Sequence, residues 1–97
     1  MAMIRVSVEE MQSAATRCNQ LAEKIAECKQ ECIALNNQLQ SAWDGQAASA
    51  FDNFVTGTAT RVLDDCSQMC SQTSTAITHT CNQFTEADST LSGTFKM

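Results

Sequence analysis

Six cysteines are the side chains of this 97-residue chain best suited to chemistry: Cys18, Cys28, Cys32, Cys66, Cys70 and Cys81. Cys28 and Cys32 lie four positions apart, as do Cys66 and Cys70, so each pair presents its thiols on one face of a helix. Four thiolates could hold Zn(II) or Cu(I), whereas pairs of thiols could form disulfides in an oxidising compartment. In a third interpretation, all six are small buried apolar residues with inert thiols. The spacing permits a metal without requiring one, and we expect no metal or other cofactor.

The rest of the sequence offers little for catalysis. It has no glycine-rich phosphate loop, and its single histidine, His79, belongs to no identifiable set of nucleophile, base and orienting group. Asp64 and Asp65 are adjacent, so on a helix they point to different sides and do not form an acid and base pair. A formal charge of -5 with only six Lys and Arg residues argues against a nucleic-acid partner. We predict a non-enzymatic protein that acts through protein contacts.

Apolar residues at helical spacing organise the first half. Ser7 and Glu10 have the spacing of a capping box, which predicts a helix start. The apolar line that follows advances in steps of three and four: Met11, Ala14, Cys18, Leu21, Ile25, Cys28, Cys32, Leu35, Leu39 and Ala42. The line predicts a first helix over about 7–41, with its charged residues off the line.

A second line predicts a second helix over about 47–90. Its members are Phe51, Val55, Thr58, Val62, Cys66, Met69, Thr73, Ile77, Thr80 and Phe84. Helix propensity is low at Thr56-Gly57-Thr58, so tertiary packing must stabilise this helix. Gly93 and its Ser and Thr neighbours predict a flexible tail over about 91–97.

The turn between the helices is expected at about 42–46, where Gly45 can adopt positive φ and Trp43 supplies a large apolar surface. The sequence thus predicts an all-α fold with a single domain over 1–97, a helix-turn-helix hairpin. Helices of this length reach roughly 50 to 60 Å, too long for a compact monomer. We expect an antiparallel homodimer forming an elongated four-helix bundle, with a heterodimer as the main alternative. It would bury the secondary apolar positions Ala15, Ala22, Phe54, Ala59, Leu63 and Ala76.

The first ten residues, with one Arg, lack the apolar stretch of a Sec signal peptide, and no segment has the length and apolarity of a transmembrane span. Any export is expected to use another route.

With Trp43-x-Gly45 at its centre and Phe84, Asp88, Leu91 and Phe95 near its C-terminus, the chain resembles the WXG, or early secreted antigenic target-like, family of small secreted proteins. The central Trp43-x-Gly45 between two helices carries the first part of the resemblance. The second part is a C-terminal pattern of hydrophobic, acidic, hydrophobic and hydrophobic residues at Phe84, Asp88, Leu91 and Phe95. Many relatives have Tyr where Phe84 stands; Phe keeps the ring and lacks the hydroxyl.

The resemblance implies export by a type VII (ESX/Ess-like) secretion system as a folded dimer, from the bacterial cytoplasm to the cell surface or medium. It implies a two-part signal, with Trp43 and Gly45 of one protomer beside Phe84 and Asp88 of the other, read by a membrane ATPase of the FtsK/SpoIIIE type. A virulence role fits, as does a targeting partner or chaperone of a larger secreted effector. Trp43 could instead serve packing alone. An acidic residue near a helix C-terminus opposes the helix dipole, which favours function for Asp88.

The positions of the cysteines can be compared within one hairpin and between two antiparallel hairpins. If positions paired across the hairpin sum to about 88, as the elbow implies, Cys18 lies level with Cys70. Between antiparallel hairpins, a constant offset of about 38 would match Cys28 with Cys66 and Cys32 with Cys70 across the interface. Intrachain and interchain disulfides, free thiols and a metal site all stay open at this point.

Overall fold

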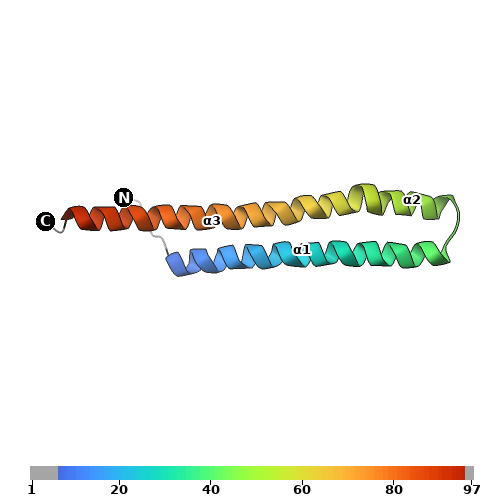
Figure 1. Cartoon of the computed structure of the whole chain (residues 1–97), viewed down its shortest axis with the longest axis horizontal. Coiled ribbons are helices and arrows are strands. Elements are labelled where there is room, and N and C mark those ends of the chain that lie inside the picture. Colours follow the sequence, from blue (N-terminus) through green and yellow to red (C-terminus); the bar gives the residue numbers. More distant parts are fainter. Residues whose placement is uncertain (1–6, 96–97) are drawn as a thin grey trace, which may run out of the picture.

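The computed structural model describes residues 7–95, and over this range the chain is a hairpin of two antiparallel helical rods (Figure 1). The first rod is α1 (Val8–Ala42). The second rod consists of α2 (Gln46–Phe54), a π-helical turn η1 (Val55–Ala59) and α3 (Thr60–Phe95). The described residues contain no strand, and the hairpin extends 78 × 21 × 19 Å. The predicted all-α hairpin is confirmed.

The start of α1 has the predicted cap. The Ser7 hydroxyl accepts the Glu10 backbone N–H at 3.3 Å, and the Ser7 carbonyl accepts the Met11 N–H at 3.0 Å. The first bond gives a partner to an N–H that has none inside the helix, and the second is the first regular bond of the helix.

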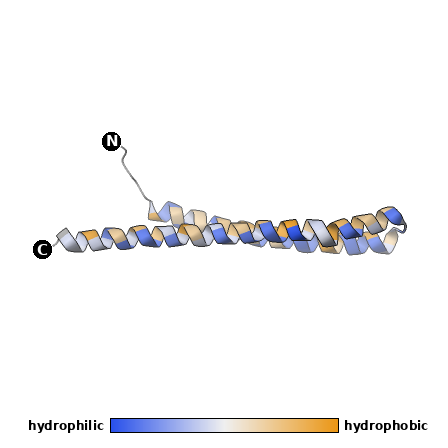
Figure 2. Ribbon diagram, turned by 90° about the horizontal axis from the view of Figure 1, so that it is seen from above, coloured by the Kyte–Doolittle hydropathy of each residue, from blue (hydrophilic) through white to orange (hydrophobic). Residues whose placement is uncertain are grey.

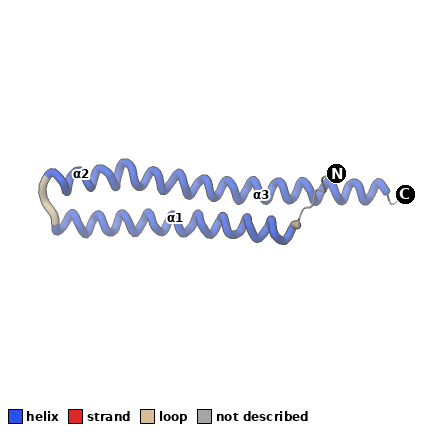
Figure 3. The backbone as a smooth tube through the Cα atoms, turned by 180° about the vertical axis from the view of Figure 1, so that it is seen from behind, coloured by secondary structure: helices blue, strands red, loops and turns tan. Residues whose placement is uncertain are grey.

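A three-residue connection, 43–45, reverses the chain and lies inside the expected turn (Figure 3). Trp43 ends α1 because its backbone is extended, with φ -141° and ψ 119°. Gly45 has a φ of 114°, which a residue with a Cβ rarely adopts. The Gly45 carbonyl then accepts the Ser49 N–H at 3.1 Å, which starts α2.

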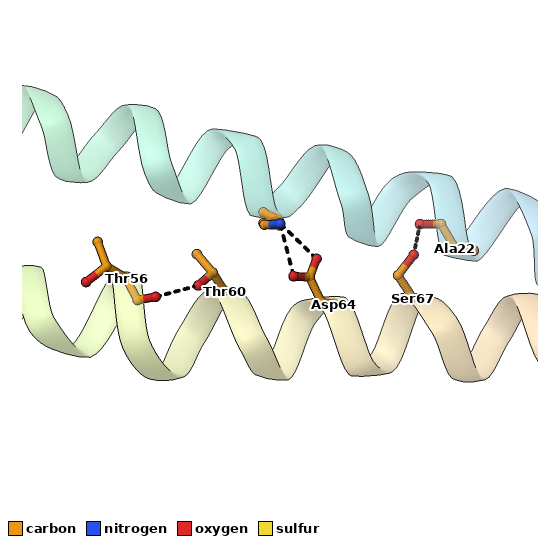
Figure 4. A network of polar contacts seen from close by, with 6 residues as sticks. Ala22, Thr56, Thr60, Asp64 and Ser67 are labelled. Carbon is orange, nitrogen blue, oxygen red and sulfur yellow. Dashed lines mark hydrogen bonds and ion pairs between the residues drawn. The ribbon is translucent and has the colours of Figure 1, made fainter.

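The π-turn η1 places an extra residue in one turn of the second rod. The Thr60 N–H donates to the Val55 carbonyl, five residues earlier. The Thr60 hydroxyl donates to the Thr56 carbonyl at 2.9 Å, so the carbonyl four residues earlier also has a donor (Figure 4). The Thr56 hydroxyl donates in the same way to the Asp52 carbonyl at 2.9 Å. One extra residue turns the helix that follows by about 100° relative to a continuous α-helix.

Small side chains form the contact between α1 and α3. We call the residues that each rod turns toward the other the seam. The Ser67 hydroxyl donates to the Ala22 carbonyl at 2.9 Å and the Ser74 hydroxyl to the Ala15 carbonyl at 2.8 Å, and each pair of numbers sums to 89 (Figure 4 shows the first). Short side chains on both helices let a hydroxyl of one reach the backbone of the other. Farther along, Cys81 is 2% exposed.

Only four of the ten residues in the apolar line predicted for the first helix lie on the seam. The members that are partly buried against the second rod are Met11, Cys18, Ile25 and Cys32. The members that are exposed are Ala14, Leu21, Cys28, Leu35, Leu39 and Ala42. The expectation that Ala15 and Ala22 need a second hairpin is wrong, because α3 already buries them to 5% and 8% exposure. Ala59 and Leu63 are partly buried as well, whereas Phe54 and Ala76 are exposed.

On the second rod the predicted line lies on the seam at Val55, departs from it after η1 and meets it again at Ile77. Val62, Cys66, Met69 and Thr73 are exposed, and each is followed by a residue that turns toward α1. Those following residues are Leu63, Ser67, Cys70 and Ser74. The physical reason is the extra residue in η1, which rotates α3 so that the seam moves by one position.

The C-terminal part of α3 extends beyond the start of α1 (Figure 1). Since seam partners sum to 89, residues after about 82 have no described α1 residue level with them. The helix continues to Phe95, whereas we expected it to end near 90. The last two residues of the expected tail, 96–97, and the Phe95 side chain lie outside the described residues.

Candidate functional site

Apart from Val8 at the start of α1, the exposed large apolar side chains of the paired rods share one position relative to the seam, and we call this surface the apolar side. Its residues are Leu21, Leu35, Leu39, Phe51, Phe54, Val62 and Met69. Each directly precedes a residue that is at least partly buried against the other rod. In an antiparallel helix pair, residues that directly precede the contact positions of both helices lie on the same side of the pair. These seven side chains therefore face one way.

The opposite side of the pair is polar. The exposed residues that directly follow seam positions include Glu23, Asn37, Gln68 and Thr75. Among the described residues that flank the seam, no exposed large apolar side chain lies on that side. Hydrophobic and hydrophilic residues accordingly alternate along both rods (Figure 2). The hairpin as a whole is amphipathic, and an exposed apolar surface with polar surroundings is typical of a protein-contact site.

The surface area shows how much of the hairpin a partner could cover. The chain exposes 7726 Å², whereas a compact monomer of its mass would expose about 5,400 Å². Its radius of gyration is 22.0 Å, against about 12.5 Å for a compact domain of this length. A standard interface covers about 800 Å² on each partner. The exposed surface of the chain therefore exceeds that of a compact monomer by more than one standard interface covers on each partner.

The elbow adds Trp43 to this surface at one end of the rod. The Trp43 and Phe51 ring centroids are 6.1 Å apart with an interplanar angle of 50°, a tilted aromatic contact. Trp43 is 40% exposed, so the contact leaves much of the indole available. Packing and recognition are thus compatible roles for this side chain.

A polar network that the sequence analysis did not foresee holds the elbow. Asn36, 3% exposed, donates through Nδ2 to Asp52 Oδ1 at 2.7 Å. Gln40 Nε2 donates to the Ala48 carbonyl at 2.9 Å and to Asn36 Oδ1 at 3.2 Å. The network joins the end of α1 to α2 on either side of the elbow. Its sequence signal is Asn36, which lies two heptads after Ala22 on the same face of α1.

The C-terminal motif lies on the part of α3 that extends beyond the start of α1, about residues 83–95, which we call the overhang. Phe84 is 45% exposed, Leu91 is 58% exposed and Asp88 is exposed. With steps of three and four, these residues continue the seam line that runs through Ile77 and Cys81. Past the start of α1, that line has no described residue of the first rod beside it. The motif is therefore a helical contact line open to a partner.

The position of Asp88 corrects one argument for its function. Because α3 continues to Phe95, Asp88 lies about two turns before the helix end. The helix dipole acts mainly within the last turn, so it penalises Asp88 little. What singles out Asp88 is its place between two exposed apolar residues.

The two proposed halves of the signal lie at opposite ends of one hairpin. The elbow containing Trp43 and Gly45 is at one end of the rod, and the overhang with Phe84 and Asp88 is at the other (Figure 1). The long dimension is 78 Å. One chain therefore does not bring them together.

The cysteines fall into three environments. Cys81 is buried, Cys18, Cys32 and Cys70 are partly buried on the seam, and Cys28 and Cys66 are exposed. All six are free thiols in this structure. Cys18 and Cys70 lie at the level at which seam partners sum to 88 or 89.

The Cys28 and Cys32 pair shows one electrostatic effect. Desolvation raises the pKa of the Cys32 thiol, and the neighbouring Cys28 thiol and Glu31 carboxylate raise it further. The Cys32 thiol is therefore a weaker source of thiolate than an ordinary cysteine. Over residues 7–95, no group of three or more metal-ligating side chains comes together. A single hairpin does not assemble the four-thiolate site considered from the sequence.

Among the described helices, none combines the length and the hydropathy that crossing a bilayer requires.

Comparison with known proteins agrees with the hairpin and its elbow. The model of the family described as "Proteins of 100 residues with WXG" matches residues 3–89. No curated protein matches the chain, and neither does any solved structure. The family match includes Trp43-x-Gly45 and most of both rods. The chain therefore belongs to the WXG100 family of small proteins associated with type VII secretion.

Proposed function

We propose that this protein is exported by a type VII secretion system as a folded antiparallel homodimer and acts through protein contacts without catalysis. The observation that carries the proposal is the separation of Trp43 and Asp88 at opposite ends of a hairpin whose long apolar side is exposed. A head-to-tail dimer covers the apolar side and brings each elbow beside the other overhang.

A second copy is the occupant that the surface favours. The apolar side runs along both rods, so it matches a partner of the same length better than a compact domain. A two-fold axis across the rods makes the surface self-complementary, because each residue that contacts another is contacted in return. The result is the elongated four-helix bundle that the sequence predicts.

In this dimer the export signal is a composite of Trp43 and Gly45 from one chain with Phe84, Asp88, Leu91 and Phe95 from the other. The described part of the overhang supplies exposed apolar groups and one carboxylate on a single helical line. A membrane ATPase of the FtsK/SpoIIIE type is the proposed reader. A folded dimer carries two copies of the signal, and an unfolded chain carries none.

A secretion assay tests the proposal with Trp43→Ala and Asp88→Ala, in strains with and without the membrane ATPase. Asp65→Ala is the matched control, since Asp65 is also an exposed carboxylate of α3 but lies outside the motif. We expect both motif variants to stay in the cells and the control to reach the medium. Circular dichroism and light scattering must first show that all variants are folded dimers. Equal export of every variant, or export without the ATPase, would refute the proposal.

The same surface could take another polypeptide, as a targeting partner of a larger effector would require. Purification from the native strain separates the two arrangements. A dimer of this chain alone supports the homodimer, and a stoichiometric second polypeptide would replace it.

A further inference from the structure

Cys66 is the exposed thiol nearest the centre of the apolar side. It directly precedes the seam residue Ser67, so it lies on the same side of the hairpin as Val62 and Met69. These two neighbours are 50% and 66% exposed. The seam cysteines Cys18, Cys32, Cys70 and Cys81 are all at least partly buried. Cys66 is thus a thiol surrounded by the surface that a second hairpin would cover.

The axial position of Cys66 follows from the register of the seam. The midpoint of α1 (Val8–Ala42) is residue 25, which is level with about residue 64 of α3 because seam partners sum to 89. A head-to-tail dimer that overlaps the whole of α1 has its two-fold axis at this level. Placing each elbow level with the other chain's Phe84 to Asp88 moves the axis by about two residues, or roughly 3 Å. Both estimates put the axis within two residues of Cys66.

The symmetry also decides which helices face each other. A two-fold axis that crosses the rods and stacks the apolar sides places α3 against α3 and α1 against α1 at the centre of the dimer. There, α1 lies diagonally from the α3 of the second copy. The Cys28 and Cys66 pairing considered from the sequence joins diagonal helices. A pairing of Cys66 with its own copy joins facing helices at the axis.

We propose that two Cys66 residues form a symmetric interchain disulfide that locks the dimer in an oxidising environment. This inference rests on the proposed homodimer. The reaction needs an oxidant, which is a low-molecular-weight disulfide. One Cys66 thiolate attacks that disulfide and releases one thiol, and the second Cys66 thiolate attacks the resulting mixed disulfide and releases the other. Two protein thiols are oxidised, one small disulfide is reduced to two thiols, and one S–S bond forms in the protein. The bond requires Cα atoms about 4.4–6.8 Å apart, a separation that facing helices can reach.

The test treats the full chain with oxidised glutathione and compares wild type with Cys66→Ser and Cys28→Ser. Cys28 is the matched control because it is also exposed and also directly precedes a seam residue. On non-reducing gels, wild type and Cys28→Ser should shift from 10.5 kDa to twice that mass. Cys66→Ser should remain at 10.5 kDa, and dithiothreitol should reverse the shift.

Peptide mapping identifies the bond without any variant. Cleavage after Arg61 by trypsin and after Met69 by cyanogen bromide releases residues 62–69, which contain Cys66 as their single cysteine. This peptide disulfide-linked to itself is the expected product. An oxidised dimer that lacks this product, or a crosslink that persists in Cys66→Ser, would overturn the inference while leaving the dimer in place. Light scattering of the reduced protein separates this outcome from failure of the proposed function. A monomeric mass in reductant would contradict the proposed homodimer, whereas a dimeric mass would contradict only the disulfide.

Discussion

Deletion of Gly57 is a direct test of the role of η1. A one-residue deletion inside a regular helix turns everything after it by about 100° and removes it from its contacts. At Gly57 the deletion should instead remove the extra residue of the π-turn, so that a continuous α-helix keeps Ser67 and Ser74 against α1. It also removes a helical glycine, which costs about 0.8–1.0 kcal/mol relative to Ala. We expect the free energy of unfolding to stay within about 1 kcal/mol of wild type.

Deletion of Gln68 is the matched control, because Gln68 is exposed and lies in the regular part of α3. At this position no extra residue compensates for the deletion, so the following part of α3 rotates by about 100°. The rotation moves Ser74, Ile77 and Cys81 away from their contacts with α1. Losing the Ser74 bond to the Ala15 carbonyl and the burial of two side chains should cost about 3–5 kcal/mol.

Urea unfolding followed by circular dichroism at 222 nm measures both deletions at one chain concentration, since the proposed dimer makes stability concentration-dependent. A clear difference between them supports the reasoning. If deleting Gly57 destabilises the protein as much as deleting Gln68, then η1 is not a one-residue insertion that the fold absorbs.

Three further predictions concern other parts of the molecule. Leu35→Asp should weaken the proposed dimer at least about 100-fold, because each dimer loses the burial free energy of two leucine side chains, about 1.5–3 kcal/mol each. Gln30→Asp, at an exposed polar position, should leave the dimer unchanged. Analytical ultracentrifugation of both variants at several concentrations measures the difference. Asn36→Ala should destabilise the hairpin by about 1–3 kcal/mol because it leaves the Asp52 and Gln40 groups short of a partner, and unchanged urea midpoints would contradict this. Cys32 should react with iodoacetamide more slowly than Cys28, with the gap narrowing as pH rises toward the raised Cys32 pKa; mass spectrometry of timed samples shows the order.

The helices and the elbow were predictable from local chemistry. The predicted capping box needs a hydroxyl and a glutamate three positions later, and the structure shows the half in which the Ser7 hydroxyl accepts the Glu10 N–H. Gly45 was expected to adopt positive φ, and it does. Each of these features depends on residues within one turn of the chain, so the sequence is enough to predict it.

The face of α3 was not predictable by the same rule. A constant helical period leads from Val55 to Val62 and Met69, and the π-turn breaks that period by one residue. The low helix propensity of Thr56-Gly57-Thr58 marked the place without showing that the break was a π-turn. Thr60 did not distinguish it either, because the Thr73 hydroxyl makes the same bond to the carbonyl four residues earlier in the regular part of α3. Periodicity alone cannot detect an inserted residue that changes which face of a helix packs against its neighbour.

The rotation at η1 connects the fold to the proposed function. Without the extra residue in η1, the helical period that passes through Val55 would turn Val62 and Met69 toward α1. Their large side chains would then be buried between the two rods of the same hairpin. With it, the seam takes Ser67 and Ser74, whose short hydroxyl side chains suit close contact with α1. The large apolar groups are then left on the apolar side, where only another chain can bury them. We infer that the single hairpin is less stable than it could be because its large apolar groups are kept for an interface. The proposed signal has its two halves at opposite ends of this hairpin, so the proposed dimer both buries these groups and brings the two halves together.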